Sequence, residues 1–266
     1  MRAMCHIALV ATRARPWYPW LTRLRRRVSG VDGLNRHLPW RAWCALGARD
    51  AIAVAWVVAR RAGRPLRFVQ IGSNDGVVHD PIHTVVRAYG WSGLLVEPLP
   101  ELFAKLRANY EGVPNLRFEN VAIGEADGTA ILYTVAPAPG DPYWVDQLGS
   151  FEKSTVLSHG TALADVEGRL VEVPVASVRL PTLLARHAID AIDLLHVDVE
   201  GYDYAVLRQI DFDATWAPHF VIYEAQHFDG ATARSARRLL RGHGYRCIDI
   251  WPDVFAYRTS PEALPS

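Results

Sequence analysis

Apolar and polar positions follow two different periods along the chain after residue 64, and together they predict strands that alternate with helices. Short continuous apolar runs predict buried strands, and apolar residues three or four positions apart predict helices. The predicted strands are 67–71, 93–97, 116–121, 193–198, 218–224, 245–250 and 253–258. The predicted helices are 81–89, 100–109, 181–187, 202–210 and 231–242. This alternation predicts an α/β fold with a mostly parallel sheet.

The last two predicted strands are too close in the sequence for a helical crossover. A short link around Trp251 and Pro252 joins residues 245–250 to 253–258, so the two strands must form a hairpin. The pattern therefore predicts a Rossmann-like sheet of seven strands, mostly parallel with one antiparallel terminal strand, within a domain that covers residues 65–266. A 3-2-1-4-5 order of the parallel strands would place the fourth strand beside the first.

The alternation is interrupted between residues 124 and 178. Residues 129–135 and 171–178 resemble strands outside the main set, and residues 136–170 between them form a long segment rich in proline, glycine and aromatic residues. Long connections of this kind are commonly functional lids. Side chains suited to stacking on a sugar ring or bonding its hydroxyls are Tyr143, Trp144, Phe151, Gln147 and Ser150. The alternative is a structural flap over the sheet edge.

Charge divides the chain at residue 64. Residues 1–64 contain thirteen arginines, two aspartates and five of the nine tryptophans, a net charge of about +11, whereas residues 65–266 carry about −10. Arginine and tryptophan together are typical of membrane-interface segments, which predicts peripheral contact with the inner face of a membrane. The alternative is that this basic extension folds back onto the acidic domain. Within it, residues 50–61 predict a helix far too short to span a bilayer.

The first predicted strand ends in a glycine-rich turn. Gly72, Ser73, Asn74, Asp75 and Gly76 follow it directly, and the next strand ends in a carboxylate, Glu97. Ligands of open α/β sheets bind at the carboxyl ends of the strands, so this arrangement indicates a nucleoside site with a carboxylate for the ribose diol. The G-x-G-x-x-G spacing of dinucleotide sites and the Gly-Lys-Ser/Thr of phosphate-binding loops are both absent. An acidic turn favours a cationic ligand such as S-adenosylmethionine, although a tight structural turn also explains the motif.

Ionisable residues gather at the ends of two later strands. His196, Asp198 and Glu200 alternate at the end of the fourth strand, Glu224 ends the next one, and His227 follows it. Alternate residues of a strand share a face, so these groups are expected at one edge of the sheet. Carboxylates and imidazoles can exchange protons with a substrate or hold a divalent cation. A structural alternative, an acidic residue at a helix N-terminus, explains only one or two of them.

Several of these motifs occur in the order typical of one family, and the chain resembles the FkbM family of S-adenosylmethionine-dependent methyltransferases over roughly residues 66–258. The motifs that carry the resemblance are Gln70–Gly76, Asp80-Pro81, Gly90–Pro98, Asn120–Ile123, Gln147–Phe151, Asp193–Tyr202 and Ile222–Glu224. Residues 1–64 are not explained by it. The family has the seven-stranded class I methyltransferase sheet, in agreement with the pattern.

The resemblance implies O-methylation of a hydroxyl on a sugar, glycan, glycolipid or polyketide-type acceptor. It also implies a set of cofactor-binding residues: Gln70, Gly72, Asn74, Asp75, Gly76, Glu97, Asn120, Val121, Ala122 and Asp198. Among these, the turn would hold the methionine part, Glu97 the ribose and residues 120–122 the adenine. The candidate catalytic residues are Asp198, His227, Glu224 and His196, with Asp198 nearest the cofactor and acceptor and His227 or Glu224 handling the proton. The metal dependence stays open.

A second class of function fits the same features. The domain can be a non-catalytic nucleoside-binding partner within a glycan-assembly complex, to which the basic extension and acidic body would contribute. The expected partners are a small-molecule or lipid-linked glycan acceptor, and no nucleic acid is expected because the acidic body offers no basic groove. Three widely spaced cysteines form no disulfide framework, which indicates a reducing compartment and a cytoplasmic location.

Overall fold

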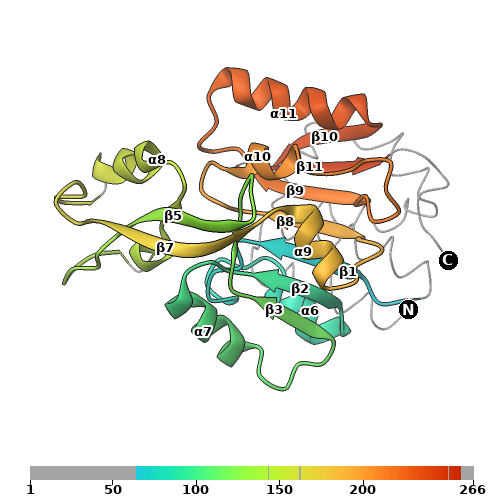
Figure 1. The fold of residues 1–266 in the computed structure, drawn as a ribbon, viewed down its shortest axis with the longest axis horizontal. Helices are drawn as coiled ribbons and strands as arrows, with labels where there is room; N and C mark the ends of the chain where they lie inside the picture. Colours follow the sequence, from blue (N-terminus) through green and yellow to red (C-terminus); the bar gives the residue numbers. More distant parts are fainter. Residues whose placement is uncertain (1–63, 143, 162, 251, 259–266) are drawn as a thin grey trace, which may run out of the picture.

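A computed structural model describes residues 64–142, 144–161, 163–250 and 252–258, and its main element is a seven-stranded sheet (Figure 1). The strands are β1 (Arg67–Ile71), β2 (Ser92–Val96), β3 (Leu116–Glu119), β8 (Leu194–Val197), β9 (Phe220–Glu224), β10 (Tyr245–Ile250) and β11 (Asp253–Arg258). Their order is β10-β11-β9-β8-β1-β2-β3. β11 runs antiparallel to both of its neighbours, and the other pairs are parallel.

This sheet confirms the predicted fold class and the place of the fourth parallel strand beside the first. The terminal strand of the chain is antiparallel, as predicted, but it is inserted between β9 and β10 and leaves β10 at the edge. The predicted strand 116–121 is shorter in the structure. β3 ends at Glu119, and Ala122 and Ile123 form β4 of a different sheet.

Five helices connect the strands of the main sheet. They are α6 (His83–Tyr89), α7 (Pro100–Asn109), α9 (Leu180–Arg186), α10 (Asp203–Leu207) and α11 (Gly230–Gly242). Four agree with the predicted ranges to within two residues at each end. The fourth predicted helix, 202–210, is wrong at its C-terminal end because the bonding pattern tightens after Leu207: the amide of Ile210 donates to the carbonyl of Leu207, three residues back.

The two faces of the sheet bury separate layers of apolar side chains. Successive residues of a strand point to opposite faces, so Val69 and Val197 pack with α9, α10 and α11, whereas Phe68 and Leu194 pack with α6 and α7. The strands are therefore covered on both sides, which explains their continuous apolar sequences. Polar side chains that follow the strands emerge beyond this core, at the carboxyl edge.

A second, smaller sheet interrupts the alternation, and it contains the two strands predicted at 129–135 and 171–178. The strands β4 (Ala122–Ile123), β7 (Leu170–Val178), β5 (Gly128–Val135) and β6 (Gly149–Ser150) pair in that order. β5 and β7 form a long antiparallel ribbon that extends away from the main sheet (Figure 1). The segment between them, which we call the lid segment (residues 136–170), contains η1 (Val145–Gln147), α8 (Lys153–Ser158) and η2 (His159–Thr161).

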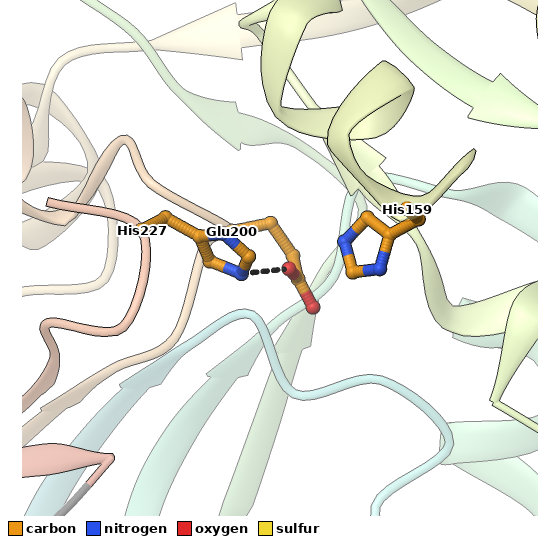
Figure 2. A group of neighbouring side chains, drawn as sticks. All are labelled: His159, Glu200 and His227. Carbon is orange, nitrogen blue, oxygen red and sulfur yellow. Dashed lines mark ion pairs between the residues drawn. The ribbon is translucent and has the colours of Figure 1, made fainter. Parts of the chain in front are cut away.

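The lid segment has a small apolar core of its own. Val145, Leu148, Val156, Leu163 and Val166 pack together with Val135 of β5. The sequence pattern suggests a long loop, whereas the structure shows packed short elements. This packing places η2 against the carboxyl edge of the main sheet, where His159 faces Glu200 and His227 (Figure 2).

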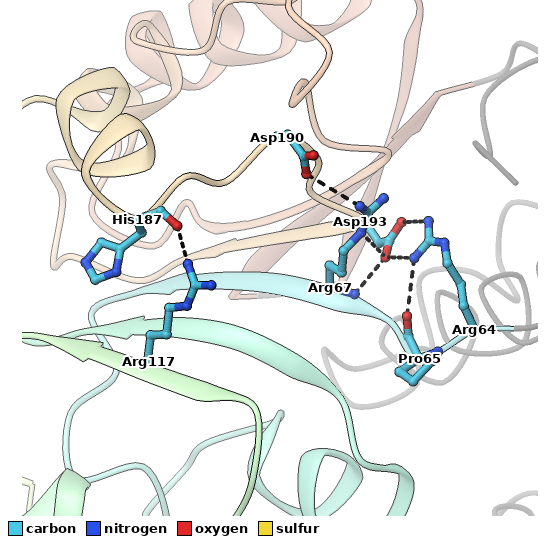
Figure 3. Close-up of polar contacts among 7 residues, drawn as sticks. All are labelled: Arg64, Pro65, Arg67, Arg117, His187, Asp190 and Asp193. Atoms are coloured by element: carbon cyan, nitrogen blue, oxygen red, sulfur yellow. Dashed lines mark hydrogen bonds and ion pairs between the residues drawn. The ribbon is translucent and has the colours of Figure 1, made fainter.

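The basic extension meets the described part of the chain at Arg64. Its guanidinium donates to both carboxylate oxygens of Asp193, at 2.6 and 2.7 Å (Figure 3). Asp193 is 1% exposed and also accepts the amide of Arg67 at 2.7 Å. This contact clamps the start of β1 to the start of β8. The predicted helix 50–61 and the predicted membrane contact lie outside the described residues, and none of the described helices has the length and apolarity needed to cross a membrane.

We expect the Arg64–Asp193 clamp to contribute more to stability than any exposed ion pair. Arg64→Ala should lower the free energy of unfolding by about 2 kcal/mol, because it leaves a buried carboxylate with fewer donors. Urea denaturation measures the change. The matched control is Arg208→Ala, which breaks an exposed pair with Glu125 and should cost about 0.5 kcal/mol or less. Equal effects of the two substitutions would contradict the clamp.

Candidate functional site

The turn after β1 has the backbone conformation that its glycines predict. Gly72, Asn74 and Gly76 have φ of 79°, 55° and 72°, in the left-handed region. Such values favour glycine, and asparagine tolerates them better than most residues do. The amides of Gly72 and Ser73 both donate to the carbonyl of Val96, which ties the turn to the end of β2.

The protein itself requires the two glycines. A Cβ on Gly72 would lie 1.7 Å from the carbonyl oxygen of Asp198, so the main chains at the ends of β1 and β8 touch. A Cβ on Gly76 would lie 2.5 Å from Leu106 and 2.6 Å from Tyr110, both of the α7 region. The absence of a side chain at both glycines therefore allows neighbouring parts of the protein to pack closely against the turn. It also fixes the turn directly beside the residues that follow β8.

Glu97 joins the turn to the end of β2. The side chain is only 4% exposed, and its two oxygens accept the amides of Asn74 at 2.8 Å and Leu99 at 2.9 Å. Burial raises the pKa of Glu97 to about 7 against the opposing effect of these two hydrogen bonds. Each carboxylate oxygen retains a further lone pair for a ligand hydroxyl.

Polar side chains beneath the turn hold it in place. Asp75 accepts the amides of Val77 and Val78 and so closes its own turn. Gln70, buried in β1, donates to Asp80, whose pKa burial raises. The carbonyl oxygen of the Gln70 side chain and that of Asn74 are buried without a hydrogen-bond partner.

The predicted adenine segment lies where the chain passes from the main sheet to the second sheet. Asn120 donates to the carbonyls of Glu97 and Pro98, at 2.7 and 3.0 Å, and thereby ties this crossing to the end of β2. Val121 and Ala122 are buried. The three residues therefore lie near Glu97, on the β2 side of the turn.

A cluster of carboxylates occupies the other side of the turn. Asp198, Glu200 and Glu224 each bring one oxygen within 4.8 Å of the others. Asp198 is exposed, yet desolvation by the surrounding protein, and then the charges of Glu200 and Asp203, raise its pKa. Burial raises the pKa of Glu224 too, and the charge of Asp198 adds to the effect. Crowded carboxylates of this kind bind protons or cations readily.

Two histidines flank this cluster. His227 Nε2 lies 3.0 Å from Glu200 Oε2 and 3.8 Å from Glu224 Oε2. The contact with Glu200 raises the pKa of His227, although burial opposes it. On the other side of Glu200, His159 of the lid segment faces His227, with ring centres 5.6 Å apart (Figure 2). A residue from each of three distant segments thus converges on one point.

The lid segment fixes the position of Glu200. Ser150 Oγ donates to the backbone carbonyl of Glu200 at 2.8 Å, and Ser150 is 1% exposed. Glu200 itself has φ of 51°, which costs roughly 1 kcal/mol for a residue with a side chain. A Cβ on the neighbouring Gly201 would meet Thr155 at 3.2 Å and His227 at 3.3 Å. The strained turn is held between the lid segment and the loop after β9.

The structure brings most of the predicted catalytic residues together, but not all of them. Asp198, Glu224 and His227 lie in the cluster. His196 is 3% exposed and pairs in register with Gln70, on the face that α6 and α7 cover, and burial lowers its pKa to about 4. Asp203, at the start of α10, is fully buried and accepts the amide of Glu224. It supports the cluster from below.

The lid side chains differ in their surroundings. Trp144 packs on His159, and Phe151 packs edge-on against Tyr202. The hydroxyl of Ser150 donates its hydrogen bond to the carbonyl of Glu200, and Tyr143 lies outside the described residues. His159 was not among the predicted site residues. The one signal for it in the sequence is that His159 is the only histidine in residues 136–170.

Comparison with known families identifies the chain. A family model described as the methyltransferase FkbM domain matches residues 70–247. The matched span runs from β1 to β10 and includes the turn, Glu97 and the carboxylate cluster. The chain belongs to the FkbM methyltransferase family. Membership implies methyl transfer from S-adenosylmethionine, and the resemblance found in the sequence is confirmed.

Several solved structures are similar to the chain at low sequence identity. The methyltransferase FkbM from Methylobacillus flagellatus has a TM-score of 0.43 and 11% identity, over 73% of this chain and 43% of that one. The ribosomal protein L11 methylase from Lactobacillus delbrueckii has a TM-score of 0.39 and 12% identity, over 79% and 80%. A fibrillarin pre-rRNA processing protein from Methanococcus jannaschii has 0.38 and 12%, over 73% and 66%. No curated protein matches the chain significantly.

The residues around the turn fit the cofactor that the family implies. The buried side-chain carbonyl of Asn74 lacks a hydrogen-bond partner, and Glu97 retains acceptor capacity for a diol. Positive φ values at residues 72, 74 and 76 shape the turn without a basic side chain, as suits a ligand that carries a positive charge.

We expect Gly72→Ala to damage both folding and cofactor binding. The new methyl group would overlap the carbonyl oxygen of Asp198 and force β1 and β8 apart, at a cost of about 3 kcal/mol or more. The control is Gly112→Ala, at φ of 75° with open space around it, which should cost only about 1 kcal/mol of backbone strain. Urea denaturation and calorimetric titration with S-adenosylmethionine give the two readouts. Similar losses in both variants would argue against the close contact.

Proposed function

We propose that this protein transfers a methyl group from S-adenosylmethionine to a hydroxyl of a sugar, glycan, glycolipid or polyketide-type acceptor. The observation that carries the proposal is the direct contact between the turn at Gly72 and the main chain of Asp198. It joins a nucleoside-type turn to a cluster of proton-accepting groups. When bound, the cofactor supplies an electrophilic methyl group on a sulfonium sulfur, which leaves as a neutral thioether.

In this proposal the residues on the β2 side of the turn bind the cofactor. The turn 72–76 with Gln70 and Asp75 holds the methionine part, Glu97 accepts hydrogen bonds from the ribose, and residues 120–122 flank the adenine. The buried carboxylate of Glu97 supports this role because it is already oriented by two backbone amides. An oriented acceptor loses little conformational entropy when the ligand binds.

The residues on the β8 side act on the acceptor. A hydroxyl is a poor nucleophile, and positioned acid–base groups typically contribute about 10²–10⁴-fold to such reactions. Asp198 is the exposed member of the cluster and orients the acceptor hydroxyl in this proposal, while the neighbouring Glu224 or His227 handles its proton. The lid segment reaches the cluster through Ser150, which bonds to Glu200, and His159, which faces His227. His196, buried away from the cluster, has no part in this proton path.

We expect Glu97→Gln to weaken cofactor binding about tenfold or more and to remove part of its pH dependence. Because burial raises the pKa of the free Glu97 carboxyl to about 7, the wild-type carboxylate is largely protonated at pH 6 and ionised at pH 8. The ionised form is the better acceptor for ribose hydroxyls. Wild-type affinity should therefore rise with pH through about 7 and then level off.

Calorimetric titration with S-adenosylmethionine at pH 6 and pH 8 checks this. Glu125→Gln, which alters an exposed carboxylate outside the turn, should behave like the wild type. A pH profile in Glu97→Gln identical to that of the wild type would remove Glu97 from the ribose site. No binding to folded wild-type protein would favour a non-catalytic partner in a glycan-assembly complex.

We expect Asp198→Asn to lower turnover by about 10²-fold while the cofactor dissociation constant changes by less than about threefold. Transfer of labelled methyl groups to pooled glycan, glycolipid and polyketide-type acceptors provides the assay, and Asp211→Asn, an exposed residue after α10, is the control. Full turnover in Asp198→Asn would show that a residue other than Asp198 orients the acceptor hydroxyl. Transfer to nitrogen-containing acceptors alone would overturn the proposed O-methylation.

A further inference from the structure

We propose that His159, Glu200 and His227 bind a divalent transition-metal ion that joins the lid segment to the main sheet. The ion would lie next to the carboxylates of Asp198 and Glu224. Its binding can be measured without cofactor or acceptor, so only its consequence for turnover rests on the proposed function.

The geometry supplies three ligand atoms from three separate segments. One ring nitrogen of His159, one of His227 and a carboxylate oxygen of Glu200 all lie within 4.8 Å of one another. His159 comes from the lid segment, Glu200 from the turn after β8, and His227 from the loop after β9. Figure 2 shows the Glu200 carboxylate between the two imidazole rings. The strained backbone at Glu200, held by Ser150, fixes the middle ligand.

A ring nitrogen of each histidine lacks the hydrogen bond that a buried polar atom normally makes. Nε2 of His159 and Nε2 of His227 are shielded from water and have no aligned hydrogen-bond partner, and the same is true of Glu224 Oε2. Unsatisfied buried polar atoms are uncommon in native proteins, and some of them are the ligands of a bound ion. Two neighbouring imidazoles that share this condition point to a ligand between them.

The local charge also favours a cation. No arginine or lysine of the described ranges forms an ion pair with Asp198, Glu200 or Glu224. The histidine contacts with Glu200 and Glu224 are the ion pairs that this cluster makes within the described chain. A doubly charged ion would reduce the repulsion among the three carboxylates at once.

The donor set selects the class of ion. Two imidazoles and one carboxylate suit Zn²⁺ and related first-row ions, whereas Mg²⁺ and Ca²⁺ prefer oxygen ligands only. Metal–ligand distances of about 2.1 Å separate two ligands of one ion by at most about 4.2 Å. A bound ion therefore requires the ligand atoms of His159, Glu200 and His227 to lie within about 4.2 Å of one another. A bound ion would also lower the pKa of an acceptor hydroxyl that coordinates it.

The simpler interpretation is an ion pair between protonated His227 and Glu200, with His159 as a packing residue. The two interpretations differ in their requirement for His159. An ion pair needs only His227 and Glu200, while the metal site loses a ligand when His159 is removed. A substitution in the lid segment therefore decides between them.

The test is equilibrium dialysis of the chelator-treated full chain against Zn²⁺ alone, with Mn²⁺ and Mg²⁺ as separate arms, followed by metal analysis. We expect the wild type to bind Zn²⁺ at this site, and His159→Ala and Glu200→Gln to bind it at least about tenfold more weakly. The matched control is His187→Ala, because His187 is equally half-buried and lies 3.1 Å from a carboxylate, Glu119, outside the cluster. Its Zn²⁺ binding should equal that of the wild type.

Circular dichroism reports whether each variant folds, and His159→Gln replaces His159→Ala if the smaller side chain prevents folding. Zn²⁺ binding that persists in both the His159 and Glu200 variants would overturn the site. Preference for Mg²⁺ without dependence on His159 would also overturn it in favour of an all-oxygen site. Titration of S-adenosylmethionine into the same variants keeps the outcomes separate: cofactor binding without metal binding refutes only the metal site.

Discussion

The contact between the main chains at Gly72 and Asp198 is the constraint on which the rest of this site depends. β1 and β8 are neighbouring parallel strands, so their carboxyl ends lie side by side in any fold of this topology. Here they approach so closely that no side chain fits between them. As a result, the turn bound to Glu97 and the carboxylate cluster are direct neighbours at the carboxyl edge. A wider spacing would leave the two groups of residues as separate features.

The carboxyl edge concentrates carboxyl groups whose pKa values burial raises, and neighbouring backbone amides stabilise some of them. Asp203 is buried and Asp253, the register partner of Glu224, is half-buried, and burial raises their pKa values to about 7 and about 6. Backbone amides donate hydrogen bonds to the carboxylates of Asp203 and Glu97 and thereby fix their orientation. The carboxylates nearer the surface, Asp198 and Glu224, lack such support in the described chain. The carboxyl groups left without such donors are therefore those at the ends of β8 and β9.

Much of the fold could be predicted because its signals are local. Apolar runs mark the strands, and the short link at Trp251 and Pro252 implies the hairpin, which the pairing of β10 and β11 confirms. The insertion of β11 between β9 and β10 could not be derived in this way, because nothing in the hairpin sequence specifies its neighbour. β3 ends just before Asn120, whose side-chain amide donates to carbonyls after β2, a contact between neighbouring strands that no local pattern shows.

The site residues that lie at strand ends could be predicted from the sequence. Glu97, Asp198 and Glu224 follow buried strands, so the topology alone brings them to one edge. His159 reaches the same place through the packing of the lid segment, which depends on contacts among Val145, Val156 and Leu163 that no periodicity shows. His196 shows the opposite error. Strand alternation predicts that it shares a face with Asp198, but it does not predict how deeply α6 and α7 bury it.

The hydrogen bond from Ser150 to Glu200 has a consequence for the order of events during a catalytic cycle. An outward movement of the lid segment would break this bond, release the strained turn at Glu200 and separate His159 from His227. The reactive arrangement would then exist only after the acceptor has entered and the segment has returned. In the proposed reaction, acceptor entry and methyl transfer would then occur in two different positions of the lid segment.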